Sequence, residues 1–147
     1  MKVNQLGAEQ EHDLLSPLSI NNYTVRDTFT FANFIKNFSP NISTHMVSFD
    51  VVSLFSNIPL NETIDIICDK IYREKLIQIN IPEKDLSKLL KICTTEAHFL
   101  FNGKIFEQGD GVAMGSPLGP VLANIFMAYL EEEYIRNYDN SALILWQ

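Results

Sequence analysis

The chain has 147 residues, of which 46% are hydrophobic and 20% are charged, and its formal net charge is −7. This length and composition fit one globular domain and exclude a disordered chain. The acidic balance argues against a protein that neutralises a long nucleic-acid backbone by itself, although it leaves room for carboxylates that hold metal ions.

Neither a targeting segment nor a membrane span is expected. The first ten residues, MKVNQLGAEQ, lack the apolar core of a signal peptide, and no apolar run is long enough to cross a bilayer. Cys68 and Cys93 occupy apolar positions of expected helices without zinc-like spacing. This pattern indicates two buried thiols in a reducing compartment.

The N-terminal part is expected to be a lead-in followed by a helix. Residues 1–22 are polar and contain Pro17, so we expect a loose segment there. An amphipathic helix is predicted over residues 25–38, with Phe29 and Ile35 on its inner face. Thr24 and Asp27 resemble a capping box at its start.

Residues 45–52, HMVSFDVV, are predicted to form a short strand. Because the segment is mostly apolar, we expect it to be buried on both faces. Asp50 interrupts the apolar run. A carboxylate in such a strand is costly unless it is paired or bound to a metal.

The middle of the chain is expected to form two helices and a hairpin. One amphipathic helix is predicted from about residue 61 to residue 75, and the next opens at Pro82. Asn102-Gly103 separates two short apolar runs. This arrangement predicts a β-hairpin with a type I′ turn.

Residues 107–130, EQGDGVAMGSPLGPVLANIFMAYL, have the pattern of a glycine-rich loop that runs into a helix with Pro120 in its first turn. Four of the six glycines lie here, and glycine permits positive φ and close backbone approach. Such a loop can hold a phosphate or a nucleotide, or it can be glycine-rich for packing alone. A final strand is predicted over residues 142–146.

Two motifs carry a resemblance to a known family. VSFDVVSLFSNIPLNETI and DGVAMGSPLGPVLANIFM resemble the central motifs of the reverse transcriptase palm, in the wording of Penelope-like retroelements, which are transposable elements related to telomerase reverse transcriptase. The resemblance implies that residues 23–147 are a partial fingers and palm domain of α+β class. Its expected form is an incomplete antiparallel sheet with helices packed on one face, a fragment truncated before the second aspartate motif.

The resemblance implies a magnesium site. Asp50 corresponds to the first catalytic aspartate, and the carbonyl of Val51 corresponds to a further metal ligand. Hard oxygen ligands suit Mg²⁺, which in the complete enzyme supports two-metal nucleotidyl transfer. The alternative for Asp50 is a capping or salt-bridged carboxylate.

The resemblance also implies a nucleotide site. Phe55 corresponds to the residue whose ring excludes the 2′-hydroxyl of a ribonucleotide, and a core phenylalanine is the alternative. Met114, Gly115, Ser116 and Pro117 correspond to the segment that lines the incoming nucleotide. Met114 departs from the glutamine of many reverse transcriptases, which replaces a hydrogen-bonding side chain with a soft apolar one.

The function implied is that of an RNA-directed DNA polymerase, which extends a DNA primer on an RNA template with deoxynucleoside triphosphates. We expect this chain alone to be inactive, because it carries only one of the two aspartate motifs. The thumb, and any downstream endonuclease domain, would belong to the full-length protein. A retroelement polymerase would be intracellular and reach the nucleus at some stage.

A non-catalytic remnant that binds nucleic acid or protein is the alternative. The net acidity disfavours duplex binding, because few phosphates could be neutralised.

Overall fold

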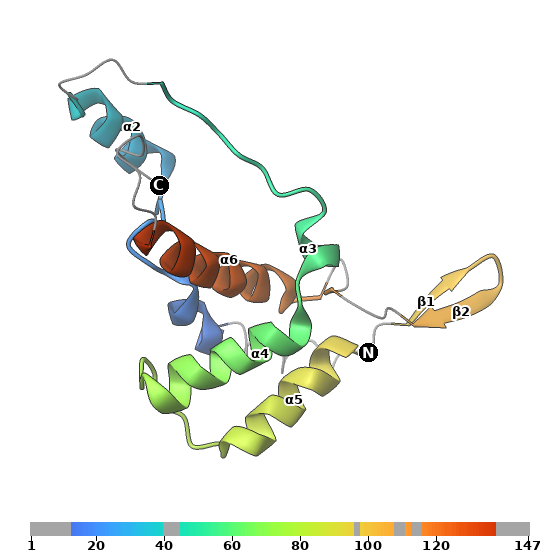
Figure 1. Ribbon diagram of the computed structural model, residues 1–147. Helices are drawn as coiled ribbons and strands as arrows, with labels where there is room; N and C mark the ends of the chain where they lie inside the picture. The colour runs from blue at the N-terminus through green and yellow to red at the C-terminus, as the bar shows by residue number, and fades with distance from the viewer. Residues whose placement is uncertain (1–12, 40–44, 96–97, 108–110, 113–115, 138–147) are drawn as a thin grey trace.

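The computed structural model describes residues 13–39, 45–95, 98–107, 111–112 and 116–137 (Figure 1). Over these residues the chain combines helices with one two-stranded antiparallel sheet. The predicted α+β class is therefore confirmed in this coarse form.

The helices and strands follow the predicted order, except that residues 45–52 form no strand. They are the 3-10 helix η1 (Ser16–Ser19), α2 (Thr28–Asn37), α3 (Leu54–Asn57), α4 (Leu60–Cys68), the π-helical turn η2 (Asp69–Arg73), α5 (Glu83–Thr95), β1 (His98–Phe101), β2 (Lys104–Glu107) and α6 (Gly119–Arg136). Figure 1 shows α4 and α5 on one side of α6 and α2 on the other.

The hydrophobic core surrounds the first half of α6. Val121, Leu122 and Ile125 are 2%, 0% and 0% exposed. Helices α4 and α5, η1 and the turn before α4 all contribute buried side chains to the same cluster. Burial of this kind supplies about 1.5–3 kcal/mol for each large apolar side chain. Most of the stability of the described fold therefore depends on the contacts of α6.

The end of the expected lead-in packs into this core. Leu15 and Leu18 are each 1% exposed, and Asn21 Nδ2 donates to the carbonyl of Ala128 at 3.2 Å and to Glu131 Oε2 at 2.8 Å. The structure thus differs from the expected loose segment over residues 13–21, while residues 1–12 lie outside the described residues. Two leucines at i, i+3 spacing were enough to hold a polar segment on α6.

A buried ion pair adds a second tie between α4 and α6. Lys70 lies in η2, directly after α4, and its Nζ is 3.2 Å from Glu132 Oε2. The Lys70 side chain is only 7% exposed and that of Glu132 is 32% exposed. Because removing one partner would leave the other charge poorly solvated, this pair fixes which faces of η2 and α6 meet.

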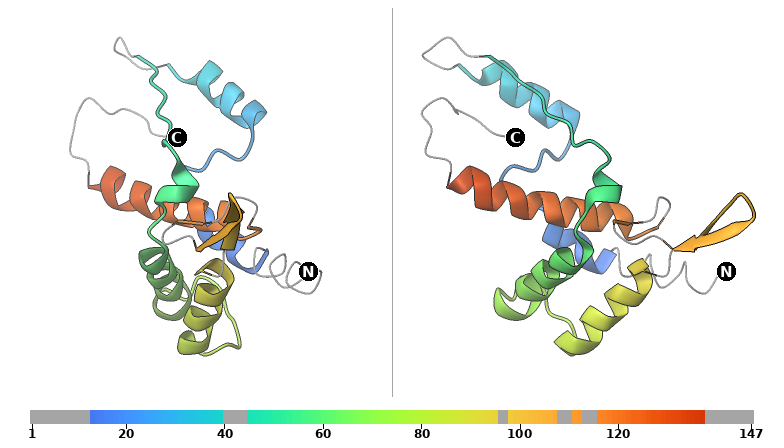
Figure 2. Two further views of the ribbon diagram at one scale, coloured as in Figure 1. Left: turned by 90° about the vertical axis from the view of Figure 1, so that its right-hand side faces the viewer. Right: turned by 45° about the vertical axis from the view of Figure 1, so that its right-hand side comes forward.

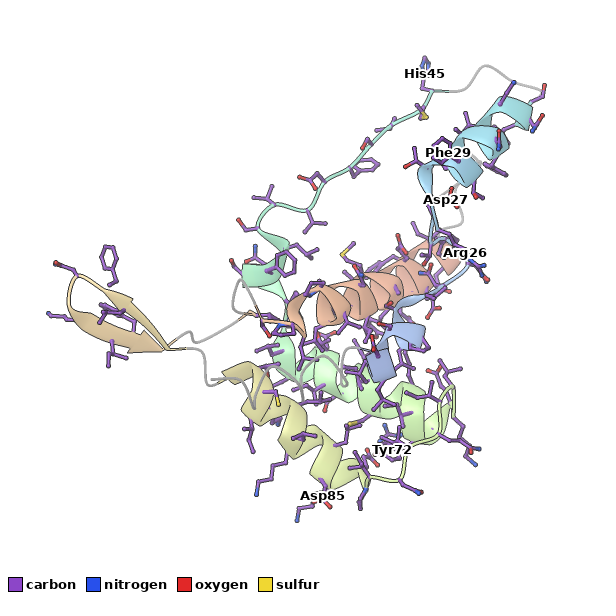
Figure 3. The ribbon with its side chains drawn as sticks, turned by 180° about the vertical axis from the view of Figure 1, so that it is seen from behind. Arg26, Asp27, Phe29, His45, Tyr72 and Asp85 are labelled. Carbon is purple, nitrogen blue, oxygen red and sulfur yellow. The ribbon has the colours of Figure 1, made fainter. Side chains whose placement is uncertain are left out.

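Helix α2 begins differently from the prediction and buries none of its residues. Asp27 is the N-cap, and its carboxylate accepts from the backbone N of Thr30 at 2.8 Å and from its hydroxyl at 2.6 Å. Thr24 Oγ1 instead accepts from the backbone N of Asn21 at 3.0 Å, so the predicted capping box is wrong. Phe29, expected on the inner face, is 83% exposed because no described element covers it (Figure 3).

The predicted hairpin is confirmed, including its turn. Leu100 pairs with Ile105, and the φ angles of Asn102 and Gly103 are +49° and +73°, as a type I′ turn requires. The hairpin extends away from the helices in Figure 1 and in the right-hand view of Figure 2, and Leu100 and Ile105 are 72% and 73% exposed. Helices therefore do not cover a face of this sheet within the described ranges.

The strand predicted over residues 45–52 does not form. The segment is extended but exposed, with Met46, Phe49 and Val52 at 83%, 76% and 80% exposure. A strand needs a neighbour for its backbone groups, and no strand of the described part of the chain lies beside this one. The strand predicted over residues 142–146 lies outside the described residues.

Replacement of Leu18 tests whether η1 belongs to the core. We expect Leu18→Ala to lower the free energy of unfolding by about 2–5 kcal/mol, because it leaves a cavity beside α6. Ile20→Ala is the control, since Ile20 is 58% exposed. Urea denaturation of the two variants measures the difference. Equal, small losses would show that residues 13–21 are as loose as their composition suggests.

The N-cap of α2 should respond to pH. Hydrogen bonds from the Thr30 side chain and backbone lower the pKa of Asp27 below its ordinary value of 3.8. A lowered folded-state pKa contributes stability above pH 3.8 that is lost as the pH falls through the folded pKa. We expect helical circular dichroism to decrease over that window in the wild type. In Asp27→Asn the amide still caps the helix, so this component of the decrease should disappear.

Candidate functional site

The two motifs singled out in the sequence meet at the start of α6. The backbone N of Val112 donates to the carbonyl of Phe55 at 2.7 Å. The Phe55 ring also packs against the first turn of α6: a Cβ placed on Gly119 would lie 3.6 Å from its Cδ1 atom. Tertiary structure therefore brings the segment after Asp50 onto the glycine-rich loop.

A tight turn delivers Phe55 to this position. Ser53 has φ +52° and ψ +44°, a left-handed conformation that turns the extended segment into α3. The backbone N of Ser56 and that of Asn57 both donate to the Ser53 carbonyl, at 3.0 and 3.2 Å. Asn57 Nδ2 donates to the carbonyl of Val52 at 3.1 Å. These bonds offset the cost of the left-handed serine, which is about 1–2 kcal/mol.

Gly111 makes the approach of the loop possible. Its φ is +75°, and a Cβ at this position would lie 2.5 Å from the Phe55 carbonyl oxygen and 2.6 Å from that of Ser56. Both distances are shorter than any real Cβ contact, so only glycine fits without movement of the α3 backbone. The glycine at position 111 is thus required by a specific contact.

Phe55 is half-buried, since one part of its ring joins the core and the rest is accessible. Ser116 and Pro117 are also half-buried, and the Ser116 carbonyl accepts from the backbone N of Gly119 at 3.0 Å. These three predicted nucleotide-site residues therefore lie around one helix start. Met114 and Gly115 lie outside the described residues.

Asp50 and Val51 lie in the exposed extended segment. Asp50 precedes Phe55 by five residues, so chain length alone keeps the two within about 17 Å. The carboxylate and the Val51 carbonyl are oxygen ligands of the kind that Mg²⁺ prefers, but they supply a single carboxylate. Across the described ranges, no group of three or more His, Cys, Asp or Glu side chains is placed to hold a metal. The donors fit Mg²⁺ in kind and fall short in number.

The sequence analysis missed Gly111 and Val112 as contacts of Phe55. Its general statement, that glycines permit positive φ and close approach, applies at Gly111. Nothing in the sequence, however, indicated which segment would approach. Gly111 and Val112 contact backbone carbonyls of α3, and every residue has a backbone carbonyl, so the sequence pattern does not identify the contact.

The cysteines and pockets lie elsewhere. Burial raises the pKa of the Cys68 thiol, and the charges of Glu83 and Asp65 act in the same direction, so its reactive thiolate is disfavoured. Cys93 is exposed, which corrects the expectation of two buried thiols.

Two shallow pockets are lined by residues 71–80 and by parts of α4, η2 and α5, and neither includes a residue of the candidate site.

In the ranges that the structure describes, none of the helices has the length and apolar character needed to cross a membrane. No protein-family model, curated protein or solved structure matches the chain. The function must therefore be argued from the motifs and the geometry of their contact.

The close approach at Gly111 can be tested by stability. Gly111→Ala and Gly103→Ala both place alanine at a positive φ, +75° and +73°, but a Cβ on Gly103 meets nothing within 4 Å. We expect Gly111→Ala to cost about 1–3 kcal/mol more than Gly103→Ala, because it adds a steric clash to the same backbone strain. Chemical denaturation measures both. Equal losses would mean that the loop does not close on α3.

Proposed function

We propose that this chain forms the central part of a reverse transcriptase palm, an RNA-directed DNA polymerase of the Penelope-like retroelement type. The observation that supports the proposal best is the contact between Val112 and Phe55. The two motifs that resemble the family are far apart in the sequence, and a nucleotide site built from both requires them to meet. A chance resemblance gives no reason for that contact.

In this proposal the motif around Asp50 holds the metal and contacts the phosphates and the sugar. The Asp50 carboxylate and the Val51 carbonyl would hold Mg²⁺ and, through it, the phosphates. When bound, the metal ions supply charge that stabilises the attacking and leaving oxygens of an in-line transfer. The Phe55 ring would lie under the sugar, where a 2′-hydroxyl has no room.

The start of α6 would receive the base and phosphates. Ser116 and Pro117 lie at this helix start, with Met114 and Gly115 just before them in the sequence. The N-terminus of a helix carries a partial positive charge that attracts an anion. Position and electrostatics, and no covalent step with the protein, would then drive the transfer.

The remaining requirements of a polymerase would come from other parts of a larger protein. The 147 residues contain no pair of adjacent aspartates to complete the metal site. With a net charge of −7, the chain also has few groups to neutralise template and primer phosphates. We therefore propose that the 147-residue chain alone does not extend a primer, and that an RNA template and a DNA primer bind to the larger protein.

A non-catalytic interaction role is the second candidate function, and the exposed apolar side chains of residues 45–52 favour it. Met46, Phe49 and Val52 are exposed in an extended segment with an apolar composition. Exposed apolar side chains in a contiguous run mark a surface that another polypeptide covers. Both candidate functions require another polypeptide segment to cover these apolar side chains, and only the polymerase function requires the Asp50 carboxylate.

Substitution of Asp50 separates the two candidates. The gene product that contains this chain, with its flanking coding sequence, would be assayed for Mg²⁺-dependent extension of a DNA primer on an RNA template. We expect Asp50→Asn to reduce extension at least about 100-fold, because a metal ligand worth several kcal/mol is lost. Asp85→Asn is the matched control, because Asp85 lies on α5, far from His45 at the start of the extended segment (Figure 3).

Unchanged extension in Asp50→Asn would refute the assignment of this residue. Absence of extension in the wild type, together with stable binding of a protein partner that is lost when Phe49 and Val52 are replaced by serine, would favour the interaction role.

A further inference from the structure

We propose that Gly111 is a positioning residue that fixes where the Phe55 ring lies and so sets the selection between deoxyribonucleotides and ribonucleotides. The function of the ring rests on the proposed polymerase activity. The contact itself rests only on the structure. Gly111 would act through the backbone of α3 and touch no substrate.

The backbone of residues 111–112 lies very close to the backbone of Phe55 and Ser56. Gly111 has no side chain, and a Cβ there would lie 2.7 Å or less from Phe55 O, Ser56 O and Ser56 C. The next residue, Val112, is 1% exposed and donates its backbone N–H to the Phe55 carbonyl at 2.7 Å. The carbonyl of the gating residue is thus held by a buried hydrogen bond, and its position depends on the absence of a side chain next to it.

The Phe55 ring is held on its other side by α6. A Cβ on Gly119 would lie 3.6 and 3.7 Å from two ring carbons, and the Val112 side chain also reaches Gly119, at 3.5 Å. Residues 111–112 therefore contact the same first turn of α6 that supports the ring. If Gly111 moved outward, both the carbonyl and the support of the ring would shift together.

The turn before Phe55 makes this external support necessary. Ser53 adopts a left-handed conformation, and α3 is only four residues long, Leu54–Asn57. A helix of one turn has little stability of its own. The segment that precedes it, residues 45–52, is exposed and has no strand beside it among the described residues. Residues 111–112 and α6 supply this support, together with Leu54 and Ile58, which join the core on either side of Phe55.

Selectivity is sensitive to such a shift. A ring that excludes one hydroxyl must be held in van der Waals contact with the sugar to within about 0.5 Å of its best position, and misplacement of about 1 Å can change a rate 100-fold. Deoxynucleotides lack the excluded group, so they tolerate the movement better. Loss of the Gly111 contact should therefore alter the ratio of the two substrates more than the rate with the correct one.

Amide hydrogen exchange tests the contact in the 147-residue chain, without any assay of activity. We expect the Val112 amide to be protected in the wild type, because it is buried and hydrogen-bonded. In Gly111→Ala its exchange should accelerate about ten-fold or more, the factor that accompanies loss of one such bond. In Gly103→Ala, which has the same φ strain without the contact, Val112 should exchange as in the wild type.

Nucleotide selection tests the consequence. In the primer-extension protein described above, we expect Gly111→Ala to lower the ratio of kcat/KM for deoxyribonucleotide over ribonucleotide about ten-fold. Gly103→Ala should leave the ratio unchanged. In a Phe55→Ala background there is no ring to position, so addition of Gly111→Ala should leave the ratio of that background unchanged. A purely structural defect would instead reduce extension with both nucleotides equally.

The outcomes separate this inference from the proposed function. An unprotected Val112 amide in the wild type, or equal losses with both nucleotides in Gly111→Ala, would overturn the positioning role. If the wild type extends no primer, the proposed function fails. In that case a Val112 amide that is protected only when residue 111 is glycine still supports the positioning of Phe55, and an amide that is indifferent to residue 111 overturns it.

Discussion

Burial of the first half of α6 is the constraint on which the rest of the structure depends. Val121, Leu122 and Ile125 lie at the centre of the core, and a helix buried to this extent must be covered on several sides. Helix α4, helix α5 and η1 provide that cover, and the Lys70–Glu132 ion pair joins η2 to α6. Each of these elements is short, so none would be stable without the shared helix.

The position of Phe55 in the candidate site also depends on α6. Phe55 belongs to a one-turn helix and follows an exposed segment, yet its position is fixed because its ring lies on the first turn of α6 and its carbonyl is bonded to Val112. The side of the site that carries Asp50 has no such support among the described residues. The proposed metal site would need a further element beside residues 45–52, one that pairs with their backbone and covers their apolar side chains.

The hairpin shows the same imbalance between local and tertiary forces. The Asn102-Gly103 turn is strong enough to form β1 and β2, although no helix of the described structure packs on the hairpin (Figure 1). Residues 45–52 have a better β composition, but no strand of the described structure lies beside them. A favourable turn is enough to pair two adjacent strands, whereas a segment that has only a β-prone composition needs a partner strand from elsewhere in the sequence.

The sequence by itself determined the elements whose information is local: the periodicity of α4, α5 and α6, the proline in the first turn of α6 and the type I′ turn. Only the tertiary structure decided what those elements touch. It placed Leu15 and Leu18 in the core, left Phe29 exposed, moved the cap of α2 to Asp27, and brought the Phe55 carbonyl to Gly111 and Val112. The reason is that periodicity records which side of an element is buried, whereas a contact between two backbones depends on the space left by every other element and has no residue pattern of its own.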